Sequence, residues 1–251
     1  MILDLFKLDG KVAVVTGANT GLGQKMCIAL AEAGAVVVGV ARRSCDETKA
    51  LIEEGKFFEV IADLSVLSNA KYVIDSAIKI AGHVDILVNN AGMILREAAI
   101  DVKIEDFDYV LNVNLKMPFL LSQEVARHAI EDGRGAKIIN IASMLSYQGG
   151  INTVSYTASK HAILGITKNM ANEWSKYNIN VNAIAPGYMA TNNTQALRED
   201  KERSEQILGR IPAGRWGLND DMMGAVVYLA SDASSYVHGE TICVDGGWMA
   251  R

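Results

Sequence analysis

Cysteine, proline and long apolar runs are scarce in this sequence, and each shortage excludes a class of protein. The only cysteines are Cys27, Cys45 and Cys243; they form no C-x-x-C pair, so we expect reduced thiols in a cytoplasmic protein rather than disulfides or a zinc site. Three prolines in a chain that is half hydrophobic are typical of a globular protein with little disorder. No apolar run reaches about eighteen residues, and residues 1–7 do not resemble a signal peptide, so we expect neither membrane insertion nor secretion.

An excess of positive charge is also absent. The formal net charge is -5, and no basic cluster is longer than Arg42-Arg43, which argues against a nucleic-acid partner. The four histidines show no ligand spacing, so we expect no bound metal. The remaining ligand class that the motifs below support is a small molecule.

Apolar, β-branched runs alternate with helical segments along the 251 residues. A polar residue or a glycine follows the runs, and in a βαβ arrangement these positions line up on one rim of a parallel sheet. Since no linker or internal repeat divides the chain, we expect one α/β domain over residues 1–251. The predicted strands are residues 11–16, 35–40, 57–61, 84–88, 137–142, 180–185 and 240–244.

A glycine-rich turn, residues 17–23, joins the first predicted strand to a helix over residues 24–33. Glycines at 17, 21 and 23 allow backbone N–H groups to approach an anion at the helix N-terminus. The turn therefore predicts phosphate binding, although its G-x-x-x-G-x-G spacing differs from G-x-G-x-x-G. The alternative is that the turn is only a tight connection.

The end of the second predicted strand bears on the choice of nucleotide. Ala41 stands where an acidic residue would hydrogen-bond the ribose hydroxyls of NAD. Arg42 could pair with a 2'-phosphate, which favours NADP. The alternative is a solvated surface arginine.

Ser143, Tyr156 and Lys160 predict a site for proton transfer. Ser143 follows a buried strand, and Tyr156 and Lys160 are four residues apart, which stacks them on one face of a helix. We expect the neighbouring cation to lower the pKa of the phenol, and Ser143 to donate a hydrogen bond to the same substrate oxygen. Alone, such a pair also fits an amphipathic helix with a snorkelling lysine.

The segment from residue 188 to 217 is long, polar and charged, with an Arg-Glu-Asp-Lys-Glu-Arg run at 198–203. An excursion of this length at the ligand-binding rim is a candidate lid. A plain solvated helix is the alternative.

Taken together, these motifs resemble the short-chain dehydrogenase/reductase family over essentially the whole chain. The resemblance implies a single Rossmann-like, doubly wound domain with a seven-stranded parallel sheet, and hydride transfer between NAD(P) and a secondary alcohol or ketone. The motifs are Thr16–Gly23, Asn89–Gly92, Asn112–Asn114, Ser143, Tyr156–Lys160 and Pro186-Gly187.

The resemblance also implies a role for each matched residue. Tyr156 resembles the general acid/base, Lys160 the residue that lowers its pKa and holds the nicotinamide ribose, and Ser143 the donor to the carbonyl oxygen. Asn114 resembles the residue that holds a water for proton relay. The implied cofactor contacts are Gly17, Asn19, Thr20, Gly21, Leu22, Gly23, Arg42, Asp63, Leu64, Asn90, Ala91, Gly92, Tyr156, Lys160, Pro186, Gly187, Met189 and Thr191.

A closer resemblance to sugar-acid members of the family implies a deoxy keto sugar acid of uronate breakdown as substrate, NAD as cofactor and a homotetramer. It is carried by residues 141–150, 170–174, 185–194, 210–217 and 244–251. The implied cofactor conflicts with Arg42, so NAD and NADP both stay open.

An anionic polyol needs a cation for its carboxylate and polar partners for its hydroxyls. Arg96 is the candidate for the carboxylate, with surface solvation as the alternative. The candidates for the hydroxyls, beside Ser143 and Tyr156, are Gln148, Tyr188, Asn192 and Asn193; Asx turns are an alternative for the asparagines. Residues 248–251 could cover the site.

Two other functions are compatible with this fold. An oxoacyl-carrier-protein reductase would prefer a basic entrance, which the acidic run at 199–202 does not suggest. A catalytically silent nucleotide sensor could lose Ser143, Tyr156 or Lys160, and all three are present.

Overall fold

Seven parallel strands form one sheet in the order β3-β2-β1-β4-β5-β6-β7. The computed structural model describes residues 1–250, apart from the side chain of Asn193. The expected fold class is confirmed, and each predicted strand lies within two residues of its expected limits. The strands are β1 (Val12–Thr16), β2 (Val36–Ala41), β3 (Phe57–Ile61), β4 (Ile86–Asn89), β5 (Ala136–Ile141), β6 (Ile179–Pro186) and β7 (Thr241–Val244).

Burial on both faces explains why the central strands are continuous apolar runs. All residues of β1 and β6 are buried, as in parallel sheets that helices cover on both sides. Val14 of β1 pairs with Val38 of β2 on one side and with Leu87 of β4 on the other. These three side chains belong to one apolar cluster against a helical layer.

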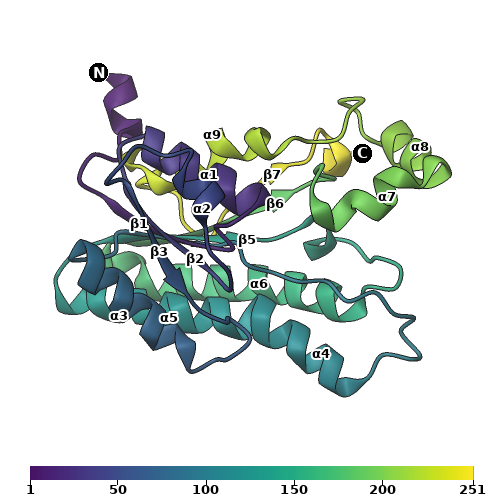
Figure 1. The fold of residues 1–251 in the computed structure, drawn as a ribbon, viewed down its shortest axis with the longest axis horizontal. Helices are drawn as coiled ribbons and strands as arrows, with labels where there is room; N and C mark the ends of the chain where they lie inside the picture. The colour runs from purple at the N-terminus through teal and green to yellow at the C-terminus, as the bar shows by residue number, and fades with distance from the viewer. Residues whose placement is uncertain (251) are drawn as a thin grey trace.

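Two helical layers enclose the sheet (Figure 1). The layer with α1 and α9 packs on one face, and the layer with α3, α5 and α6 packs on the other. No helix within residues 1–250 has the length and apolar character that a membrane crossing requires. The helices are α1 (Gly21–Glu32), α2 (Asp46–Lys49), α3 (Asn69–Ala81), α4 (Ile104–Leu111), α5 (Met117–Glu131), α6 (Val154–Trp174), α7 (Gln195–Glu199), α8 (Lys201–Arg210) and α9 (Met223–Ala230).

The chain changes direction in the sheet between β1 and β4. From β1 it proceeds outwards through β2 to β3, and it then returns to the other side of β1 as β4. The connections that leave the carboxyl ends of β1 and β4 therefore diverge, which opens the crevice where doubly wound sheets bind ligands.

A buried chain of polar side chains fastens α6 to the middle of the sheet. Asn89 Nδ2 donates to Asn140 Oδ1 (2.9 Å), and Asn140 Nδ2 donates to Thr167 Oγ1 (2.8 Å). Asn89 lies on β4, Asn140 on β5 and Thr167 on α6. Because unpaired polar groups are costly in the interior, this chain of bonds specifies where α6 packs.

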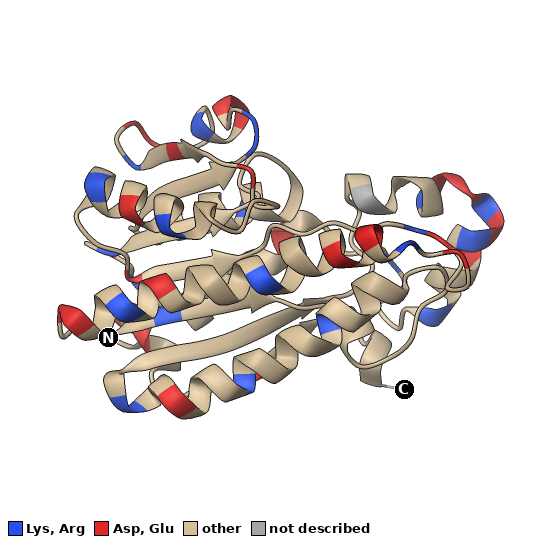
Figure 2. Ribbon diagram, turned by 90° about the horizontal axis from the view of Figure 1, so that it is seen from below, with Lys and Arg blue, Asp and Glu red and all other residues tan. Residues whose placement is uncertain are grey.

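Residues 188–217 form an excursion that contains α7 and α8, beside the C-terminus in Figure 1. Its two ends meet at a parallel bridge between Met189 and Gly217, where Ala190 N donates to Gly217 O (2.8 Å). Figure 2 shows residues of both charge signs on this excursion. Its apolar side joins a small cluster of Met144, Ile207, Ile211 and Trp248.

Leu87→Ala should lower the free energy of unfolding by about 2–5 kcal/mol, because it opens a cavity beneath a fully buried strand residue. Chemical denaturation checks this value. Leu51→Ala is the control, since Leu51 is 59% exposed and its truncation should change stability by less than about 0.5 kcal/mol. Equal losses in the two variants would contradict the assigned core.

Candidate active site

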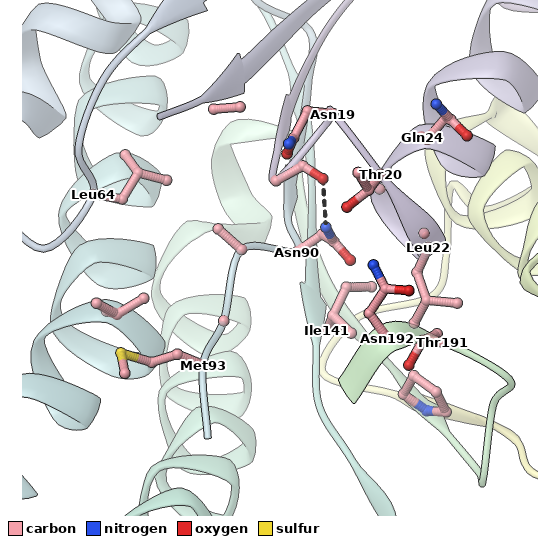
Figure 3. A pocket seen from close by; sticks show the side chains of 18 of the residues that line it. Asn19, Thr20, Leu22, Gln24, Leu64, Asn90, Met93, Ile141, Thr191 and Asn192 are labelled. Atoms are coloured by element: carbon pink, nitrogen blue, oxygen red, sulfur yellow. Dashed lines mark hydrogen bonds between the residues drawn. The ribbon is translucent and has the colours of Figure 1, made fainter. Parts of the chain in front are cut away.

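A cavity of about 690 Å³ lies at the carboxyl ends of the strands and brings most of the predicted residues together (Figure 3). The glycine turn forms one wall, and Ser143, Tyr156 and Lys160 form another. The predicted residues that line it are Gly17, Asn19, Thr20, Gly21, Leu22, Gly23, Arg42, Asp63, Leu64, Asn90, Ala91, Gly92, Ser143, Tyr156, Lys160, Pro186, Gly187, Met189, Thr191 and Asn192.

The glycine turn has the properties that a phosphate site needs. Gly17 and Gly21 have φ values of +69° and +60°, which other residues rarely adopt, and a Cβ on Gly23 would lie 2.1 Å from Gly17 O. Thr20 makes no side-chain hydrogen bond to the start of α1, so the first N–H groups of this helix are not capped by it. The turn therefore fits a dinucleotide pyrophosphate, held by backbone amides at a helix N-terminus.

Hydrogen bonds from Asn90 and Ala91 to Thr16 hold the two sides of the crevice together. Thr16 Oγ1 accepts from Asn90 N (3.0 Å) and from Ala91 N (2.9 Å). Asn90 Nδ2 in turn donates to Thr16 O (2.8 Å) and more weakly to Gly17 O (3.4 Å), so it supports the glycine turn from below (Figure 3). Asn90 thus has a clear structural role at the cavity wall.

At the far end of the cavity, Arg42 and Asp63 lie at the ends of neighbouring strands. A hydrogen bond from Ser65 N (2.8 Å) lowers the pKa of Asp63, and the charge of Arg42 lowers it further. Asp63 is therefore a carboxylate acceptor near neutral pH. Arg42 is exposed and lines the cavity, next to Ala41 at the last position of β2.

Ser143, Tyr156 and Lys160 meet where β5 ends. The turn Met144–Ser146 fixes Ser143, whose Oγ accepts from Leu145 N (3.2 Å). Tyr156 and Lys160 both lie in the first part of α6, and the Lys160 ammonium is 5.6 Å from the centre of the Tyr156 ring. Lys160 Nζ donates to Ile141 O, the last carbonyl of β5, at 2.6 Å.

The expected effect of Lys160 on the Tyr156 pKa is not what these surroundings produce. Burial raises the pKa of Tyr156, and a hydrogen bond with Ser143 and the charge of Arg96 only partly oppose this. Burial also lowers the pKa of Lys160 to about 8. The expectation was wrong because it considered the spacing of the two residues and not the desolvation of both, and because the Lys160 ammonium bonds to a backbone carbonyl.

Asn114 lies in a π-helical turn, Asn112–Lys116, between α4 and α5. Its side chain is buried and bonds to both backbone groups of Met93: Oδ1 accepts from Met93 N, and Nδ2 donates to Met93 O, each at 2.9 Å. Nδ2 also donates to Ser159 Oγ (3.2 Å). The amide therefore positions Met93, which lines the cavity, and a relay role for Asn114 stays a prediction.

The candidates for substrate binding divide into two groups. Asn192 lines the large cavity, and Arg96 is close enough for its charge to lower the Tyr156 pKa. Gln148 and Tyr188 are not among the residues lining that cavity: Gln148 contacts Met249, and Tyr188 lines a second cavity of about 340 Å³. The side chain of Asn193 lies outside the described part of the chain, as does Arg251.

Several lining residues were not predicted. Met93 follows the Asn89–Gly92 motif and Ala142 precedes Ser143, so extension of each motif by one position would have found them. Val113 is the middle residue of the Asn112–Asn114 motif. Glu47 of α2 and Asn219, at the start of a short 3-10 helix, carry no such signal, because only the fold brings these segments to the cavity. The lining residues that were not named as cofactor or substrate contacts are Gln24, Val40, Ala41, Arg43, Glu47, Ala62, Ser65, Met93, Tyr109, Val113, Ile141, Ala142, Ala190, Thr194 and Asn219; the position of Ala41 at the ribose end was expected.

Comparisons with known proteins give matches over nearly the whole chain. The family model described as enoyl-(acyl carrier protein) reductase matches residues 17–249. A 2-dehydro-3-deoxy-D-gluconate 5-dehydrogenase of Escherichia coli (strain K12) is 57% identical, and the match covers all of both chains.

Two solved structures are similar over nearly the whole chain. A putative 2-deoxy-D-gluconate 3-dehydrogenase from Agrobacterium tumefaciens with bound NADP is 50% identical at a TM-score of 0.94, and the match covers 99% of this chain and 100% of that one. A gluconate 5-dehydrogenase from Burkholderia cenocepacia J2315 in complex with NADP and tartrate is 37% identical at a TM-score of 0.94, with full coverage of both chains.

Tyr156→Phe should reduce kcat by about 10²- to 10⁴-fold, because it removes the hydroxyl that is predicted to transfer the proton while it keeps the ring. Cofactor affinity, measured by fluorescence titration, should stay within about twofold. Tyr72→Phe is the control, since Tyr72 is exposed on α3. Full turnover in the Tyr156 variant would refute the proton role.

Arg96→Met should shift the pH dependence of alcohol oxidation to higher pH. Arg96 lowers the pKa of Tyr156, so its removal raises the pH at which the phenolate base forms. The measurement is kcat/KM against pH for the wild type, Arg96→Lys and Arg96→Met. Arg127→Met, on the exposed side of α5, should leave the profile in place; an identical shift there would contradict a local effect of Arg96.

Proposed function

Because the chain belongs to the short-chain dehydrogenase/reductase family, we propose that it is a 2-dehydro-3-deoxy-D-gluconate 5-dehydrogenase. The chain is an NAD(P)-dependent oxidoreductase acting on CH–OH groups; the proposal concerns the substrate and the roles of the residues. The meeting of Ser143, Tyr156 and Lys160 at a cavity with a phosphate-binding glycine turn carries the reaction type. The name of the full-length Escherichia coli relative supplies the sugar acid.

The proposed reaction moves a hydride and a proton from one secondary alcohol. Bound NAD(P)⁺ supplies the hydride acceptor. Tyr156 takes the hydroxyl proton as general base, and Ser143 donates a hydrogen bond to the same oxygen as it becomes a carbonyl. Lys160 holds the carboxyl end of β5 in place and carries a cation beside the phenol. The reverse reaction reduces the ketone with the same groups.

The cavity has residues for either nicotinamide dinucleotide, and we propose NADP as the preferred one. The glycine turn would hold the pyrophosphate and Asp63 would contact the adenine. Asn90 and Thr191 would contact the part of the dinucleotide between its two ends. Arg42 supports NADP because its guanidinium lines the cavity where Ala41 replaces an acid. The two structural neighbours above also contain NADP.

The substrate would bind in the surroundings of Tyr156. Arg96 supports an anionic or oxygen-rich substrate, since its charge acts on the catalytic phenol. We propose that residues 188–217 form a lid over the bound substrate, with Asn192 at its inner side. We also propose that the protein is a homotetramer in the cytoplasm. Its three free cysteines agree with a reducing compartment.

A substrate screen tests the proposed activity. Purified protein should reduce 3-deoxy-D-glycero-2,5-hexodiulosonate with NADPH, and it should oxidise 2-dehydro-3-deoxy-D-gluconate with NADP⁺, both followed at the absorbance of the reduced cofactor. The kcat/KM should exceed that for D-gluconate and for an oxoacyl thioester by at least about tenfold. A higher value for the thioester would refute the sugar-acid assignment.

Arg42→Ala should raise KM for NADPH by about 10- to 100-fold and leave KM for NADH nearly unchanged, because only NADPH offers a phosphate to pair with this guanidinium. Steady-state kinetics with both cofactors measure the change. The control is Lys49→Ala, an exposed cation in α2 that does not line the cavity. An equal effect on both cofactors would refute the phosphate contact.

A further inference from the structure

Arg210, Gln148 and Trp248 come from distant parts of the sequence and lie in contact. Arg210 is the last residue of α8, and its guanidinium carbon lies 4.0 Å from the centre of the Trp248 ring. Arg210 Nη2 is 3.5 Å from Gln148 Oε1, and Gln148 Nε2 contacts Met249 Sδ at 3.3 Å. The three segments meet beside the turn that carries Ser143.

The Trp248 ring is a fixed surface on which the Arg210 guanidinium stacks. Its side chain is only 6% exposed and packs edge-on against Tyr188, with 4.8 Å between the ring centres. Tyr188 directly follows Gly187, which lines the large cavity. A guanidinium that stacks on an aromatic ring loses little of its hydrogen-bonding capacity, because its N–H groups point out from the edge of its plane.

The direction of α8 brings Arg210 to the catalytic side. Ile207 is 2% exposed and packs with Met144, the neighbour of Ser143, in the cluster that also contains Trp248. Residues 207 and 210 share a helix face because they are three positions apart. Arg210 itself is exposed and does not line the large cavity, so a solvent-accessible cation lies beside the apolar cluster that contains Met144.

We propose that Arg210 binds the carboxylate of the sugar acid and that Trp248 and Gln148 hold it in position for this contact. This inference rests on the proposed function. In that substrate the carboxyl carbon is four C–C bonds from the reacting C5, or roughly 5 Å in an extended chain. The carboxylate and the reacting hydroxyl therefore cannot occupy the same place beside Tyr156.

Two cations then have separate tasks. Arg96 acts electrostatically on Tyr156, at the end of the substrate that reacts. Arg210 contacts Gln148, five residues beyond Ser143, and in this inference serves the end that does not react.

Such a contact should bind the substrate without taking part in the chemical step. Loss of a charge-assisted hydrogen bond that is equal in the ground state and the transition state raises KM and leaves kcat unchanged. A purely structural role of Arg210 makes a different prediction, because displacement of α8 would impair charged and uncharged substrates alike.

The experiment compares the sugar acid with its neutral methyl ester in four proteins: the wild type, Arg210→Met, Arg210→Lys and the control Arg203→Met. Arg203 lies on the same helix and bonds to Gln206. For the acid, we expect Arg210→Met to raise KM by about 10- to 100-fold with kcat within about twofold, and Arg210→Lys to be intermediate. KM for the ester, the affinity for NADPH and all values of Arg203→Met should match the wild type.

Three outcomes would overturn the inference. An unchanged KM of Arg210→Met for the acid removes the contact, while the proposed function stands because the wild type is active. Equal losses for acid and ester assign Arg210 a structural role. A wild type that does not oxidise the sugar acid refutes the proposed function, and the carboxylate contact with it. As a second variant, Trp248→Phe should keep folding and raise KM for the acid alone, since a smaller ring stacks less well.

Discussion

The hydrogen bond from the Lys160 ammonium to the last carbonyl of β5 fixes the geometry of the whole site. It joins α6 to the sheet at the point where β5 delivers Ser143, so the distance between Ser143 and Tyr156 depends on it. The polar chain from Asn89 through Asn140 to Thr167 makes a second attachment of α6 to the sheet, about two helical turns beyond Lys160. With two such attachments, α6 can neither slide nor rotate against the sheet.

Desolvation is the largest cause of the pKa shifts of both Tyr156 and Lys160. It raises the pKa of Tyr156 and lowers that of Lys160, so both neutral forms are favoured by the protein interior. The hydrogen bond with Ser143 and the charge of Arg96 act in the opposite direction, towards the phenolate that the proposed general base requires. The basicity of Tyr156 is thus a balance among contributions from several parts of the chain rather than the property of one helical pair.

The sequence was sufficient to predict the elements whose signal is local. The apolar runs predicted all seven strands, and the spacing of Tyr156 and Lys160 predicted their common helix face. The polar chain through Asn140, the π-turn at Asn114 and the withdrawal of Gln148 towards Met249 were not predictable in this way. Each depends on a partner many residues away, and an isolated asparagine or glutamine gives no indication of which partner the fold will bring to it.

The parallel bridge between Met189 and Gly217 also bears on how this architecture can diversify. The bridge brings the two ends of the α7–α8 excursion together, and the apolar side of the excursion packs against Met144 and Trp248. The entropy of closing such a loop changes only slowly with its length. Evolution can therefore lengthen, shorten or exchange the helical insert to suit new ligands while the nucleotide-binding half stays as it is.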